Sequence, residues 1–171
     1  MARRDSSRAT DHLVSAAYVL AALLVVFPGV DYLANTWALR LGDLQWRYGT
    51  EGLLAGFLLT PFLGVGLACG LAAWRGHTRL LTTLGLLMLV AAVLLVLVCG
   101  DFALNALQLR HSAPPDALAR FEVGTAKTVL EYALVVAAFL FSGVAALRAG
   151  RQIRSDERSP GPPQVVVPRP R

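Results

Sequence analysis

The side chains best able to do chemistry are carboxylates that lie at the ends of long apolar runs. Asp31, Glu51, Asp101 and Glu131 each fall near the outer end of a different run, and Lys127 lies four residues before Glu131. A ring of such groups inside a membrane can bind a cation or relay protons. Each carboxylate can equally be solvated at the membrane edge, and Glu51 also suits the start of a helix. We favour the second interpretation of this candidate outer polar cluster.

Histidines and cysteines offer no site for a metal, a haem or redox chemistry. His12 and His77 are expected on one side of the membrane and His111 on the other, so they cannot share a metal ion. No histidine lies inside an apolar run, which excludes a haem held by two histidines. Cys69 and Cys99 lie toward opposite ends of neighbouring runs. Their Cα atoms are therefore expected to be farther apart than the roughly 7 Å limit for a disulfide. Because no nucleophile lies beside a base either, we predict no enzyme activity, no catalytic residue, no metal and no cofactor.

Four apolar runs carry these residues, over residues 13–30, 52–74, 80–100 and about 129–147. Each is close to the roughly 20 residues that a helix needs to cross a bilayer, and none alternates as a barrel strand does. Charged residues make up only 16% of the chain, against about 25% in a typical soluble domain. We therefore predict an all-α membrane protein, a bundle of four transmembrane helices over residues 1–149. The rest, 150–171, is expected to be a disordered tail rich in proline and arginine.

The basic residues predict the orientation. If the N-terminus, the loop 75–79 and the tail share one side, that side has eleven basic and four acidic residues, and the other has five and seven. The net charges are +7 and −2, and positively charged short loops stay in the cytoplasm. We therefore expect a multi-pass protein of the cell inner (cytoplasmic) membrane with both termini cytoplasmic. Arg3 and Arg4 precede the first apolar run, as basic residues do in a cleaved signal peptide. Tyr32, however, is too large for the small-residue pattern at which such a peptide is cleaved.

The segments between the runs carry weaker helical patterns. Apolar residues recur at helical spacing from Leu33 to Tyr48, which predicts a short amphipathic helix in the membrane interface that ends at Gly49. Its aromatic residues would be interfacial anchors, namely Trp37, Trp46 and Tyr48. Asp43 and Arg47 are spaced to form an ion pair within this helix. In the second outer loop, Pro115 and Asp116 suit a helix start.

Small residues repeat every four positions along the second run. Such a stripe lets two helix backbones approach closely in lipid, and it predicts a helix-packing face of Gly52, Gly56, Thr60 and Gly64. The same face can serve packing inside the monomer or contact with a second copy. Pro61 removes one backbone hydrogen bond and should bend this helix.

Two short stretches carry a resemblance. The residues Trp46-Arg47-Tyr48-Gly49 and the later segment 58–64, LLTPFLG, resemble small uncharacterised bacterial four-helix inner-membrane proteins. In layout alone the chain is also similar to the hormogonium-polysaccharide membrane proteins of cyanobacteria. Lys127 is the only lysine among 16 basic residues, a bias associated with GC-rich bacterial genomes. The resemblance implies a four-helix membrane fold and no activity.

Two classes of function remain. The first is a non-enzymatic accessory, assembly or structural membrane protein that acts through helix packing and its outer loops, on another membrane protein or on itself. The second is a small transporter or channel subunit that uses the outer carboxylates. The runs carry no charge near mid-bilayer, which disfavours a solitary ion-coupled pump. The basic residues flank apolar runs and form no continuous face, so nucleic acid is not an expected partner, and the lipid bilayer is.

Overall fold

Five helices make up the chain in the computed structural model, which describes the backbone of residues 2–40, 42–112 and 114–158 and, within those ranges, the side chains of residues 11–155. No strand occurs in these residues. The helices are α1 (Ala2–Thr36), α2 (Leu44–Phe57), α3 (Leu59–Trp74), α4 (Thr78–Arg110) and α5 (Pro115–Arg158). They provide four segments long and apolar enough to cross a membrane, with α2 and α3 together forming the second. The prediction of an all-α chain with four candidate spans is confirmed.

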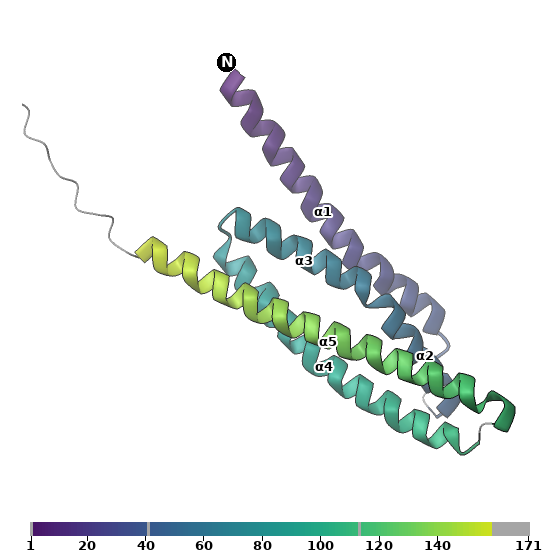
Figure 1. The fold of residues 1–171 in the computed structure, drawn as a ribbon. Helices are drawn as coiled ribbons and strands as arrows, with labels where there is room; N and C mark the ends of the chain where they lie inside the picture. Colours follow the sequence, from purple (N-terminus) through teal and green to yellow (C-terminus); the bar gives the residue numbers. More distant parts are fainter. Residues whose placement is uncertain (1, 41, 113, 159–171) are drawn as a thin grey trace, which may run out of the picture.

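Four of the five helices form two pairs (Figure 1), and α2 contacts each of these four. In one pair α4 and α5 lie antiparallel along most of their length, and in the other α1 packs on α3. Among the described residues α1 has no close backbone approach to α4 or α5, so it is the peripheral helix. The start of α1, the α3–α4 turn and the end of α5 lie toward the same end of the molecule, which we call the termini end, and the start of α1 extends well beyond the other two (Figure 1). Residues 37–43 and the α4–α5 turn lie at the opposite, loop end.

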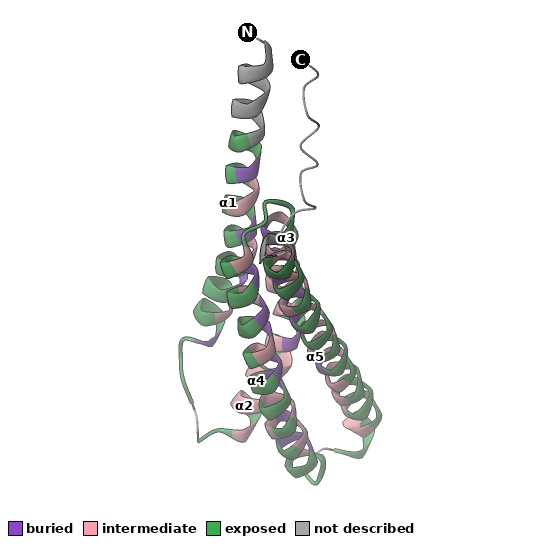
Figure 2. Cartoon of the chain, turned by 90° about the vertical axis from the view of Figure 1, so that its left-hand side faces the viewer, coloured by how far each residue is buried: buried purple, intermediate pink, exposed green. Residues whose placement is uncertain are grey.

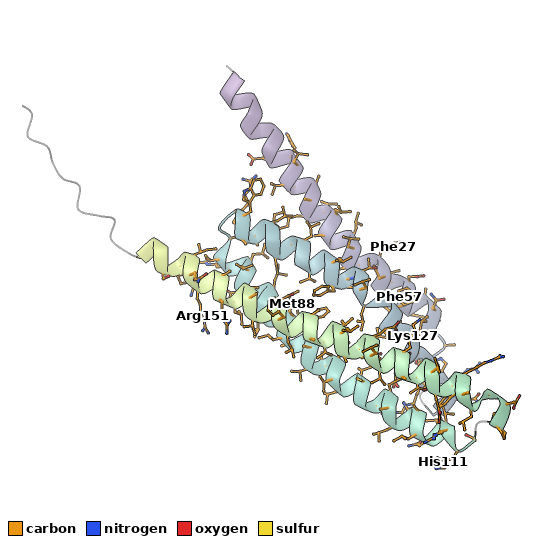
Figure 3. The ribbon with its side chains drawn as sticks, in the orientation of Figure 1. Phe27, Phe57, Met88, His111, Lys127 and Arg151 are labelled. Atoms are coloured by element: carbon orange, nitrogen blue, oxygen red, sulfur yellow. The ribbon has the colours of Figure 1, made fainter. Side chains whose placement is uncertain are left out.

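A narrow apolar core runs between the two pairs, and the outward faces are exposed (Figure 2). Met88, Ala92, Leu95 and Phe139 form its middle, and the Met88 side chain points inward while Phe27 on α1 points away from the bundle (Figure 3). Phe27 is 73% exposed. Helices that are apolar on all faces belong either in a protein core or in a membrane, and these have too little protein around them to be a core.

Pro61 explains why the second span is two helices. Its ring lacks an N–H and collides with the carbonyl four residues earlier, which is that of Phe57. The helix is interrupted after that residue, and Leu58 donates only a long bond of 3.4 Å to the Ala55 carbonyl. The sequence predicted a bend here, and the chain responds with a break between α2 and α3.

The first outer segment is built differently from the expected interfacial helix. Leu33 belongs to α1, residues 37–43 are irregular apart from Leu41, which is not described, and α2 begins at Leu44. Gly49 lies inside α2 and ends no helix. Of the residues that gave this periodicity, Leu33 lies in α1 and Leu44 and Tyr48 lie in α2, whereas Trp37 lies in the irregular segment. A sustained apolar spacing cannot separate one helix from two when the break between them is short.

The helix that contains the predicted fourth run, residues 129–147, begins at the helix start predicted in the outer loop and ends later than the run. Asp116 lies in the first turn of α5, directly after Pro115, and the helix continues without interruption to Arg158. The first nine residues assigned to the disordered tail are therefore helical, and residues 159–171 lie outside the described part of the chain. Gly150 marked the predicted boundary, yet it is buried against α4, where a Cβ atom would lie 3.1 Å from Thr82 Oγ1. Here the glycine permits close packing of α5 on α4.

Candidate functional site

The polar residues of the loop end are positioned by the start of α2. Asp43 caps this helix, because its carboxylate accepts hydrogen bonds from the backbone N–H groups of Gln45 at 2.9 Å and Trp46 at 3.2 Å. Such a cap fixes where the helix begins and therefore which way each side chain points. Arg47 and Glu51, one turn apart, then lie on the same face of α2 and turn toward α4.

Four side chains meet there, and we call them the Arg47–Asp101 cluster: Arg47, Glu51, Asp101 and Asn105. Arg47 Nη2 donates to both oxygens of the Asp101 carboxylate at 2.7 Å. Asn105 Nδ2 donates to Glu51 Oε2 at 3.0 Å and lies 3.5 Å from Asp101 Oδ2. One amide nitrogen therefore holds both carboxylates, and Asn105 is only 2% exposed. The cluster joins α2 to α4 by charge-assisted hydrogen bonds.

Two tyrosines anchor the cluster to the core and to α5. Tyr132 is fully buried, and its hydroxyl donates to the backbone carbonyl of Glu51 at 2.6 Å. Tyr48 stacks between Phe102 and Phe121, with ring centroids 4.9 Å and 5.3 Å away. Its hydroxyl lies 2.9 Å from the Thr125 hydroxyl. Tyr48 is thus a packing residue of the loop end, whereas the sequence predicted an interfacial anchor.

The other members of the predicted outer polar cluster lie apart from this site. Asp31 on α1 accepts a hydrogen bond from Asn35, one turn later in the same helix. Lys127 and Glu131 pair with each other along α5 at 3.6 Å. Of the five, only Glu51 and Asp101 belong to the Arg47–Asp101 cluster. The predicted pair of Asp43 and Arg47 is also wrong, because Asp43 caps α2 and Arg47 turns to Asp101.

Of the other two predicted anchors, Trp37 and Trp46, the first is 84% exposed in the irregular segment. Trp46 is half-buried and lines a cavity beside the Arg47–Asp101 cluster. This cavity has a volume of about 620 Å³, is open on one side, and lies between α1, α2 and α4. Its walls combine charged, aromatic and apolar side chains, which is a composition suited to binding a small amphiphilic group.

The predicted helix-packing face is divided by the break at Leu58. Gly64 on α3 lies directly against α1, since a Cβ atom there would come within 2.7 Å of the Ala21 carbonyl oxygen. Gly52 on α2 approaches the ring of Phe102, but nothing lies within 4 Å of the corresponding point on Gly56. Thr60 is half-buried. Of the predicted packing face, Gly64 alone lies close to the backbone of another helix.

The sequence analysis missed Asn105 and Tyr132. Asn105 follows Asp101 by four residues. This spacing places both on the same face of a helix, so Asn105 could have been predicted beside Asp101. Tyr132 directly follows Glu131, and nothing in the sequence separated the inward residue from its exposed neighbour. In the described residues no group of three or more histidine, cysteine or acidic side chains could hold a metal ion. The arrangement can orient and neutralise charges, and its carboxylates contact no nucleophile.

Comparison of the chain with protein-family models, with curated proteins and with solved structures finds no match. Neither resemblance noted in the sequence therefore receives support from these comparisons.

Proposed function

We propose that this chain is an integral protein of the cell inner (cytoplasmic) membrane that crosses it four times with both termini in the cytoplasm. Four apolar helical segments support the crossings. The charge distribution supports the orientation, because basic residues concentrate at the termini end, where Arg151 lies, and acidic residues at the loop end, where His111 lies (Figure 3). Positively charged loops are retained in the cytoplasm.

In that membrane the chain acts as a non-enzymatic accessory or assembly protein, through helix packing and its outer segments. The observation that carries this proposal is the distribution of buried polar groups. The buried polar groups of the described residues, those of Thr36 and Asn105 and the Tyr132 hydroxyl, all lie toward the loop end. Toward the termini end the core is apolar, with Met88 and Phe139 at its middle. An ion-coupled transporter needs polar or ionisable groups along its pathway.

A transporter or channel subunit is the competing class, and one observation favours it. The cavity beside the Arg47–Asp101 cluster is lined by Glu51 and Asp101, which could admit a cation from the loop end. Such a role would require movement of α4 or α5, because the apolar core closes the path below Asn105.

One experiment separates the two classes. We expect protein purified in mild detergent to retain a membrane-protein partner or a second copy in defined stoichiometry by native mass spectrometry. In liposomes it should pass neither protons nor Na⁺ faster than protein-free vesicles. Flux that disappears in Glu51→Gln and persists in Glu131→Gln, a control carboxylate outside the cluster, would replace the accessory proposal with transport.

A further inference from the structure

The cavity at the loop end lies where a lipid headgroup would lie. It is bounded by Tyr32 of α1, by the first two turns of α2 and by residues 97–101 of α4. Glu51 directly precedes the apolar run 52–74, so its carboxylate falls at the edge of the hydrocarbon. Since α1 does not approach α4 closely among the described residues, the space between these helices opens sideways.

The charges around this cavity are unequal. One guanidinium faces two carboxylates, those of Glu51 and Asp101, and it pairs with Asp101, whereas Glu51 is held by the Asn105 amide. Only Nη2 of Arg47 contacts Asp101, and in the described residues its Nη1 and Nε groups donate to no protein acceptor. The cavity therefore offers an excess of carboxylate together with a free guanidinium edge. A cation and an anion carried by the same molecule would complement it.

Aromatic rings add to the attraction for a cation. Trp46 and Tyr32 both line the cavity, and the Tyr32 ring is held by an edge contact with Phe57, their centroids 6.2 Å apart. An ammonium group is drawn to the face of an aromatic ring, most strongly to tryptophan. A primary ammonium also has three N–H donors for the two carboxylates, which a quaternary ammonium lacks.

The remaining walls are apolar. Leu54, Leu97 and Val98 complete the cavity. A second, almost wholly apolar cavity of about 350 Å³ lies between α1, α3 and α4 nearer the termini end, with Val25 and Leu84 in its wall. Both cavities are lined by residues of α1 and α4, so a molecule with a polar head and long apolar chains fits this side of the bundle better than a soluble amine does.

We propose that this site binds a phospholipid whose headgroup carries a primary ammonium, such as phosphatidylethanolamine. The ammonium contacts Glu51, Asp101 and the Trp46 ring, the phosphate contacts the free edge of Arg47, and the acyl chains lie between α1 and α4. The bound lipid would fill the space that the peripheral position of α1 leaves open. This inference rests on the proposed membrane location, and it gives the accessory function a lipid requirement.

The test is native mass spectrometry of the purified full-length chain in detergent micelles that contain phosphatidylethanolamine, phosphatidylcholine or phosphatidylglycerol. We expect the ethanolamine lipid to bind about tenfold better than either of the others, the value of one charge-assisted hydrogen bond. Soluble phosphoethanolamine should give no adduct, because it lacks the acyl chains. Equal binding of the three lipids would overturn the proposal, and so would an adduct with soluble phosphoethanolamine as strong as that with the lipid.

Variants locate the site. Glu51→Gln and Trp46→Leu should each reduce the ethanolamine-lipid adduct about tenfold, while Glu131→Gln should leave it unchanged. Because Trp46→Leu removes only an aromatic face, it remains informative if Glu51→Gln does not fold. Selective binding that neither variant alters would place the lipid elsewhere and refute this site. The readout needs no partner protein and no flux, so its failure is distinct from failure of the accessory function.

Discussion

Asn105 is the residue on which the loop end depends most. Its amide holds Glu51 at 3.0 Å and reaches Asp101 at 3.5 Å, and it is almost completely buried. A buried polar group is tolerated in an apolar setting only when it is hydrogen-bonded. The contact also joins α2 to α4 at the loop end of the core. This amide therefore serves both charge compensation and the packing of the two helices.

Replacing Asn105 with leucine should therefore destabilise the protein. The substitution keeps similar volume but leaves the Glu51 carboxylate without its donor, and such a loss costs about 1–3 kcal/mol. Thermal unfolding of the purified protein in one detergent measures the effect. Gln108→Leu, at an exposed position one turn later in α4, is the matched control and should change little. Equal melting temperatures for Asn105→Leu and the unchanged protein would show that the amide is dispensable.

At this scale the sequence indicated part of the site. It identified Glu51 and Asp101, because acidic residues at the edges of apolar runs are conspicuous. It paired Arg47 with Asp43, since the i, i+4 spacing is local, whereas the actual partner Asp101 lies 54 residues away. A long-range pair depends on how helices are rotated against each other, and apolar runs that are hydrophobic on every face do not encode that rotation.

At the scale of elements, glycines set how closely the helices approach. Gly85 of α4 and Gly143 of α5 face each other, and a Cβ atom on either would lie 3.0 Å from the carbonyl oxygen of the other. Gly64 has the same role where α3 meets α1. In lipid such contacts replace the hydrophobic effect as the force between helices, because lipid tails are as apolar as leucine.

The contrast between Gly64 and Gly56 gives a test of helix packing. Gly64→Leu should separate α3 from α1, since even a Cβ atom would collide with the Ala21 carbonyl, and overpacking of this kind costs about 1–3 kcal/mol or more. Gly56→Leu points into open space and should leave the melting temperature of the monomer unchanged. Crosslinked oligomer should be scored in parallel. Loss of oligomer in Gly56→Leu alone would show that the open position contacts a second copy.

Element boundaries were harder to predict than the elements. All four long apolar helical segments were predicted, because 18 or more apolar residues leave few alternatives. Gly49 was interpreted as a helix end and Gly150 as the start of the tail, and both lie inside helices, α2 and α5. Glycine is favoured after a helix because it adopts positive φ, as Gly76 does in the α3–α4 turn at 68°. In membrane helices it is also favoured inside, for packing, and the sequence does not distinguish the two uses.

For the whole molecule, the two ends have opposite character. At the termini end Arg75 pairs with Asp11 at 2.7 Å, and Tyr18 lies 3.4 Å from His77, so α1 is attached to the α3–α4 turn. At the loop end α1 passes into the irregular segment 37–43. The peripheral helix is therefore attached to the α3–α4 turn at the termini end and to α2 toward the loop end, where Tyr32 contacts Phe57 beside the proposed lipid site.

The charge difference between the ends gives a prediction for the intact protein in cells. Reporter fusions after Gly76 and after Arg158 should behave as cytoplasmic, and fusions near Asp43 and Ser112 as external, because short basic loops are not moved across the membrane. The turn at Gly76 is the most decisive position, since Arg75 and Arg79 flank it and the loop 75–79 contains no acidic residue. An alkaline phosphatase fusion there should be inactive and a green fluorescent protein fusion bright. The reverse result would invert the molecule and place the Arg47–Asp101 cluster in the cytoplasmic leaflet.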